Sequence, residues 1–164
     1  MLAIVSSATL LGVDGRPVTV EVHVSSGLPA FTIVGLPDTA CREARDRVRA
    51  AILSTERSWP TRKITVNMAP SGLRKVGSGL DLAIAIRLLL ASDQLEGASV
   101  EGIGFLGELG LDGSLRPVPG MVSLAEALPG EVAVVPAAAA DEARLVAKHQ
   151  VRPVSRLRDV VLAL

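Results

Sequence analysis

Apolar and polar residues alternate strictly in the stretch VTVEVHV, residues 18–24. The four valines face one side and the polar residues face the other, which is the pattern of a β-strand with one buried face. We expect an earlier strand near the start of the chain, joined to this one by a hairpin through Asp14-Gly15. Further strands are predicted at 31–34, 62–70, 131–136 and 150–155, with two short ones around Asp112-Gly113 within 105–118.

Apolar residues at helical spacing predict a long helix that begins after Pro37-Asp38. Its inward stripe consists of Ala44, Val48, Ala51 and Ile52. Three arginines recur at spacings of three and four on another face: Arg42, Arg45 and Arg49. Residues 81–92 are so continuously apolar that we expect a central helix covered on most sides. Shorter helices are predicted at 121–128, 137–148 and 155–164.

The composition favours one mixed α/β domain spanning residues 1–164. Hydrophobic residues make up 49% of the chain and aromatic residues only 2%, so the core consists of Val, Leu, Ile and Ala. Basic and acidic side chains number 17 each, which removes net charge as a source of attraction to nucleic acid or to a membrane. The single Cys41, the lack of a basic leader and the lack of a membrane-length apolar run predict a cytoplasmic protein with no membrane partner.

The stretch APSGLRKVGSGLDLAIAI, residues 69–86, has the residue types of a phosphate-binding loop. Such a loop needs the order G-x-x-x-x-G-K-[ST], because the lysine and the hydroxyl act together on the outer phosphates and magnesium. Here the order is Gly72, Lys75, Gly77 and Ser78, with the lysine ahead of the second glycine. The stretch therefore does not match the phosphate-binding motif.

Two stretches resemble the catalytic regions of Lon-type proteases. KVGSGLDLAIAI resembles their K-D-G-P-S-A-G segment, and FLGELGLDGSLRPVPGM resembles the strand pair that brings the lysine of G-G-L-K. When the shared Lys-x-Gly start is superimposed, the nucleophile position falls on Gly79 and the lysine position on Val122. A Ser/Lys dyad needs a lysine within reach of the hydroxyl, so both catalytic groups are absent. A Ser-based peptidase that uses the neighbouring Ser78 is the alternative.

Three longer stretches resemble, in the same order, the N-terminal domain of the ComM/YifB family of magnesium-chelatase-like AAA+ ATPases. They are VTVEVHVSSGLPAFTIVGLPDTACREARDRVRAAI, RKITVNMAPSGLRKVGSGLDLAIAI and GFLGELGLDGSLRPVPG. The resemblance implies an α/β (α+β) Lon-protease-like fold, also called ribosomal protein S5 domain 2-like, without protease chemistry. It further implies that ATP and magnesium bind in a separate AAA+ module. The parent protein then resembles a hexameric DNA helicase for branch migration in natural transformation.

The partners implied by this reading are other subunits of the same ring and DNA. Two basic groups are the candidate contacts: the helical stripe of Arg42, Arg45 and Arg49, and the pair Arg74 and Lys75. A solvated helix face, balanced by nearby acidic residues, is the simpler explanation of the stripe. Ser78, Gly79 and Val122 mark a vestigial cleft, and no cluster of His, Cys, Asp and Glu suggests a metal site. A plain oligomerisation module that touches no DNA is a further alternative.

Overall fold

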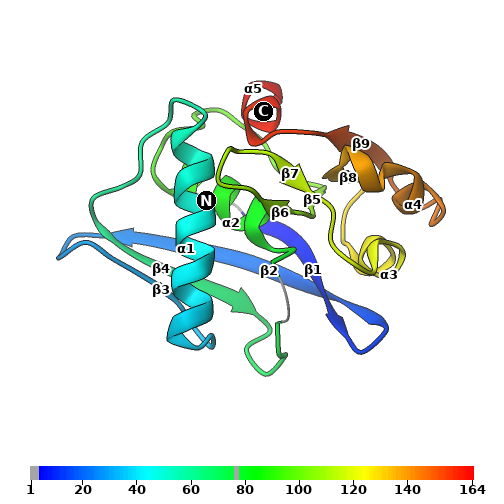
Figure 1. The fold of residues 1–164 in the computed structure, drawn as a ribbon, viewed down its shortest axis with the longest axis horizontal. Coiled ribbons are helices and arrows are strands. Elements are labelled where there is room, and N and C mark those ends of the chain that lie inside the picture. The colour runs from blue at the N-terminus through cyan, green and yellow to red at the C-terminus, as the bar shows by residue number, and fades with distance from the viewer. Residues whose placement is uncertain (1–3, 76–77) are drawn as a thin grey trace.

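The computed structural model describes residues 4–75 and 78–164. Within these residues a seven-stranded mixed sheet has the order β3-β4-β2-β1-β5-β8-β9 (Figure 1). Its strands are β1 (Val5–Leu11), β2 (Asp14–Ser25), β3 (Ala30–Ile33), β4 (Lys63–Ala69), β5 (Ile103–Phe105), β8 (Val132–Pro136) and β9 (Gln150–Val154). β2 pairs antiparallel with β1 and β4, and the other neighbours are parallel. The mixed α/β fold class is confirmed.

Helices cover both faces of this sheet. They are α1 (Asp38–Leu53), α2 (Asp81–Ala91), α3 (Met121–Ala127), α4 (Ala140–Arg144) and α5 (Leu157–Ala163). The valines predicted to share one face of residues 18–24 pack with α1 and α2 in the larger core. A second core, on the opposite face, joins Ala8 and Leu106 to α3 and α4. Near α3 the sheet approaches so closely that a Cβ at Gly15 would lie 2.1 Å from the carbonyl oxygen of Ser123.

The predicted central helix is confirmed. Every residue of α2 from Asp81 to Leu89 is buried, because α1 lies on one side of the helix and the sheet lies on the other. Its apolar run therefore reflects cover on all sides rather than one amphipathic face. The exceptions to the apolar character of this run are Asp81 and Arg87, two charged side chains that are 2% and 4% exposed.

Several boundaries differ from the sequence prediction. The first hairpin turns at Gly12-Val13 instead of Asp14-Gly15, because Asp14 already pairs with Leu11 in the ladder. Gly12 supplies the positive φ of +64° that such a turn needs. The helix expected at 137–148 is a 3-10 turn (Ala137–Ala139) followed by the short α4. β5 was not predicted, whereas the two short strands β6 (Glu108–Leu109) and β7 (Leu115–Arg116) are confirmed.

The outer edge of β3 is closed by the side chain of Cys41. The backbone N–H of Ile33 donates to its Sγ over 3.2 Å, and the thiol donates to the carbonyl oxygen of Phe31 over 3.6 Å. Cys41 lies on the first turns of α1 and is buried. At the other edge of the sheet, β9 carries Pro153, which has no N–H to offer.

Candidate functional site

The two stretches that carry the Lon resemblance meet at the start of α2. The N–H of Gly107 donates to the carbonyl oxygen of Gly79 over 3.0 Å, and the N–H of Leu82 donates to the carbonyl oxygen of Gly107 over 3.2 Å. Gly107 has a φ of +141°, and a Cβ there would lie 2.6 Å from a methyl carbon of Leu115. Only glycine fits this junction, which places β6 beside the loop that leads into α2.

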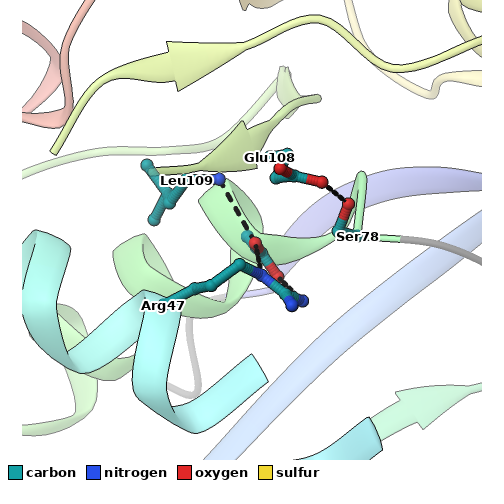
Figure 2. A network of polar contacts seen from close by, with 5 residues as sticks. Arg47, Ser78, Glu108 and Leu109 are labelled. Carbon is teal, nitrogen blue, oxygen red and sulfur yellow. Dashed lines mark hydrogen bonds and ion pairs between the residues drawn. The ribbon is translucent and has the colours of Figure 1, made fainter. Parts of the chain in front are cut away.

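A buried ion pair lies beneath this junction. Nε of Arg47, on α1, lies 2.7 Å from Oδ2 of Asp81, and Nη2 lies 3.2 Å from Oδ1 (Figure 2). The backbone N–H of Leu109 donates to the same Oδ2 over 3.2 Å. The side chain of Asp81 is 2% exposed and that of Arg47 is 25% exposed. One carboxylate therefore ties α1, α2 and β6 together.

Burial dominates the protonation behaviour of Asp81. Loss of solvent around its carboxylate and, to a smaller extent, the nearby charge of Glu108 raise the pKa of Asp81 from 3.8 to about 6. The hydrogen bonds and charge of Arg47, and the N–H of Leu109, act in the opposite direction but do not compensate. For Arg47 the hydrogen bond to Asp81 is the leading cause, and it raises the pKa of the guanidinium.

Ser78 and Glu108 form the second polar pair of the site. The hydroxyl of Ser78 donates to Oε2 of Glu108, on the side of the junction away from Arg47 (Figure 2). Both side chains line a cavity of about 280 Å³ together with Gly79. A Cβ at Gly79 would lie 3.2 Å from Cγ2 of Val118, which also lines this cavity, so any side chain at position 79 needs Val118 to shift.

The structure brings Ser78 and Gly79 together but leaves Val122 apart. Val122 lies on α3 with 40% of its surface exposed, and it does not line the cavity. Among the described residues around the cavity none is a lysine, an arginine or a histidine. The partner of the Ser78 hydroxyl is therefore a carboxylate rather than an ammonium group.

The predicted arginine stripe occupies a face of α1 away from the core. Arg42 and Arg49 are exposed and, within 4–75 and 78–164, form no ion pair. Arg45 donates from Nε and Nη2 to Oδ1 of Asp46 over 3.0 and 2.9 Å, with 39% of its side chain exposed. The stripe thus contains two unpaired cations and one that is locally neutralised.

Arg74 and Lys75 line a separate, larger cavity of about 680 Å³ next to the start of α1. The ammonium group of Lys75 donates to the carbonyl oxygen of Pro70, and burial lowers its pKa. Leu36 lines this cavity and also the smaller hollow that Arg42 borders. The cavity that Arg74 and Lys75 line and the hollow that Arg42 borders thus share one wall residue, Leu36.

Sequence reasoning named neither Arg47 nor Asp81 as a site residue. The signal for Arg47 was present, because positions 44, 47, 48 and 51 form one helical stripe in which only the arginine is polar. An arginine on an apolar stripe requires a buried anion. Asp81, at the head of an otherwise apolar helix, is the acidic residue that meets this requirement.

Within residues 4–75 and 78–164, no three His, Cys, Asp or Glu side chains come together as metal ligands. No described helix is long and apolar enough to cross a membrane.

Comparisons with known proteins add the family context. The family model "Subunit ChlI of Mg-chelatase" matches residues 20–138. The protein YifB of Salmonella typhimurium is 52% identical over 124 residues, covering 76% of this chain and 24% of that protein. Competence protein ComM of Haemophilus influenzae is 43% identical over 162 residues, covering 98% of this chain and 32% of that protein. An uncharacterised protein of Mycobacterium tuberculosis is 41% identical over 154 residues, or 92% of this chain. The chain thus spans about a quarter to a third of the length of these relatives.

Proposed function

Since the chain belongs to the ComM/YifB family of magnesium-chelatase-like proteins, we propose that it acts as a non-catalytic N-terminal accessory domain of a ComM-type AAA+ ATPase. In this proposal ATP and magnesium bind a motor module outside these 164 residues. The parent is a hexameric DNA helicase that promotes branch migration, and this domain assists ring assembly or guides DNA. The name of the Haemophilus relative, a competence protein, agrees with a role in DNA uptake.

The observation that supports a non-catalytic role is the geometry of the two former dyad positions. Position 79 is a glycine, and a Cβ added there would lie 3.2 Å from Val118. Position 122 is an exposed valine that does not line the cavity. A serine nucleophile needs a base that takes its proton and a lysine would supply one, but neither residue can take part in that transfer.

The hydrogen bond from Ser78 to Glu108 is the specific observation in favour of the peptidase alternative. A carboxylate that accepts this proton is a possible general base. We therefore test for cleavage of casein and of fluorogenic peptides by the wild-type chain and by Ser78→Ala, with Thr55→Ala as a matched loss of a hydroxyl elsewhere. We expect no turnover above the buffer rate. Turnover that Ser78→Ala abolishes and Thr55→Ala retains would show that the domain is an enzyme.

DNA guidance is supported by the unpaired cations Arg42 and Arg49 on α1 and by Arg74, which lines the cavity next to the start of that helix. Contact through these side chains is electrostatic, so affinity for labelled single-stranded or forked DNA should fall steeply with salt. Removing two phosphate contacts with Arg42→Glu and Arg49→Glu should reduce the slope of log K against log[salt] by about 1.4 on single strands. Arg144→Glu, at an ion-paired arginine on α4, is the control and should leave the slope unchanged.

Assembly without DNA contact is the competing accessory role. Fluorescence anisotropy that stays flat at low salt, together with concentration-dependent sedimentation, would favour a plain oligomerisation module. In the full reading frame, ATP hydrolysis should require the motor module, and the 164-residue chain alone should hydrolyse none.

A further inference from the structure

The cavity beside Ser78 is an apolar chamber with one charged group. Its apolar lining comes from β1, from the loop before α2, from the segment before α3 and from α3 itself: Ala8, Leu10, Leu80, Pro117, Val118, Pro119 and Leu124. The polar lining consists of Thr9, Ser78 and Glu108. Among the described lining residues, Glu108 alone carries a charge.

Within the part of the chain that the structure describes, Glu108 forms no ion pair. The guanidinium of Arg47, which interacts with the charge of Glu108, is committed to Asp81 through two hydrogen bonds. The hydroxyl of Ser78 donates to Oε2, and in the described part of the chain Oε1 of Glu108 receives no hydrogen bond. With one cation and two carboxylates, the cluster of Arg47, Asp81 and Glu108 carries a net charge of about −1 when both acids are ionised.

The size of the cavity selects the kind of ligand. Sites for whole small molecules run from about 300 to 1,000 Å³, so the 280 Å³ here is suited to a single side chain. Lysine and arginine combine an apolar stem with a cationic end, and they bury the stem along apolar surface. A stem against Leu10, Val118 and Leu124 would bring the cationic end towards Glu108.

We propose that this cavity receives a lysine or arginine side chain from a peptide segment of a partner protein, with Glu108 as the counter-charge. The inference rests on the proposed non-catalytic role, because a cleft that cleaved the segment would release it. Ser78 then acts as a positioning residue: its hydroxyl fixes Oε2 and leaves Oε1 for the incoming cation.

The test is a titration followed by ¹⁵N–¹H NMR spectra of the 164-residue protein. The probe is the peptide acetyl-Ala-Lys-Ala-amide, and the matched control peptide carries norleucine, which has a similar stem without the charge. We expect saturable shifts at the amides of residues 78–80, 108 and 118 with the lysine peptide, and at least fivefold weaker binding of the norleucine peptide. Equal binding of the two peptides, or no saturable shift at these amides, overturns the proposal.

Substitutions in the protein test whether Glu108 supplies the counter-charge. Glu108→Gln should weaken binding of the lysine peptide at least fivefold, while Glu101→Gln, at an exposed glutamate outside the cavity, should have no effect. Should Glu108→Gln fail to fold by circular dichroism, Val118→Phe, which fills the chamber, should abolish the same shifts. Undiminished binding in either cavity variant overturns the proposal.

Two further readouts distinguish a failure of this binding proposal from a failure of the proposed non-catalytic role. Mass spectrometry of the peptide after the titration reports cleavage: an intact peptide supports both proposals, whereas a cut peptide overturns the non-catalytic role independently of the binding shifts. Raising the concentration of the protein alone is the other readout. The same shifts without peptide would identify a second copy of this chain as the source of the basic side chain and overturn the assignment to a separate partner.

Discussion

Replacing Asp81 with asparagine should remove a pH dependence that runs opposite to that of most paired carboxylates. Asparagine keeps the shape of the side chain and loses its charge. In the folded protein the pKa of Asp81 lies at about 6, whereas in the unfolded chain it returns to about 3.8. Between these two values the folded state holds more protons than the unfolded state. The contribution of Asp81 to the free energy of unfolding is therefore greatest at low pH and is lost as the pH rises through this window.

The magnitude follows from the difference between the two pKa values. At about 1.4 kcal/mol for each tenfold change in proton affinity, a rise from 3.8 to about 6 corresponds to about 3 kcal/mol. Since Asp81 is 2% exposed, solvent screening removes little of this energy. Other carboxylates titrate in the same range, so the informative quantity is the difference in unfolding free energy between wild type and Asp81→Asn.

Urea unfolding at half-unit steps from pH 4 to pH 7.5 measures this difference. Far-UV circular dichroism and the fluorescence of Trp59 should report one transition. The advantage of wild type over Asp81→Asn should fall by about 2 kcal/mol of that 3 kcal/mol between pH 4 and pH 6.5, because part of the change occurs below pH 4, and should then stay nearly constant. Asp46→Asn, which removes the acidic partner of Arg45 in an exposed ion pair on α1, should alter stability by less than about 0.5 kcal/mol throughout. A wild-type advantage that is flat, or that grows with pH, would contradict burial as the dominant influence on Asp81.

Three further substitutions test other parts of the fold by the same urea assay. Gly15→Ala should destabilise the protein by about 1–3 kcal/mol or more, because its Cβ would overlap the backbone of Ser123, while Gly72→Ala, with open space around it, should change stability by less than about 0.5 kcal/mol. Arg87→Met should raise the unfolding free energy by about 1–3 kcal/mol, since Nε of this buried arginine has no hydrogen-bond partner among the described residues and desolvation lowers its pKa; a loss of stability would show that the guanidinium is well solvated. His149→Ala should cost about 1–3 kcal/mol, because both ring nitrogens lie within 2.9 Å of backbone carbonyl oxygens next to the end of α3, and an unchanged urea midpoint would mean that water replaces the ring at no cost.

The strands and helices followed from the sequence wherever one physical signal dominated. Residues 18–24 alternate because one face of β2 is buried and the other is not, and α2 is apolar throughout because it is covered on all sides. The first turn was misplaced because Asp-Gly is a stronger local turn signal than Gly-Val, yet the pairing of β1 with β2 decides the register. β5 was missed because three residues are too few to show a period.

The candidate site was harder to predict because its contacts join distant parts of the chain. Ser78 was a candidate from the sequence, but its partner Glu108 lies 30 residues away and their contact depends on the junction at Gly107. Arg47 and Asp81 are 34 residues apart, and their pairing depends on how α1 crosses α2. Periodicity indicates which face a residue occupies, and it does not indicate which residue of another element it meets.

The closed edges of the sheet restrict how copies of this domain can join. An added strand at β3 would need the outward N–H of Ile33 and the outward carbonyl of Phe31, and the thiol of Cys41 already occupies both. At β9, Pro153 removes a donor from the ladder. A strand of another copy would therefore find incomplete backbone pairing at either edge, which favours contacts through side chains, and such contacts can form and break without disturbing any strand.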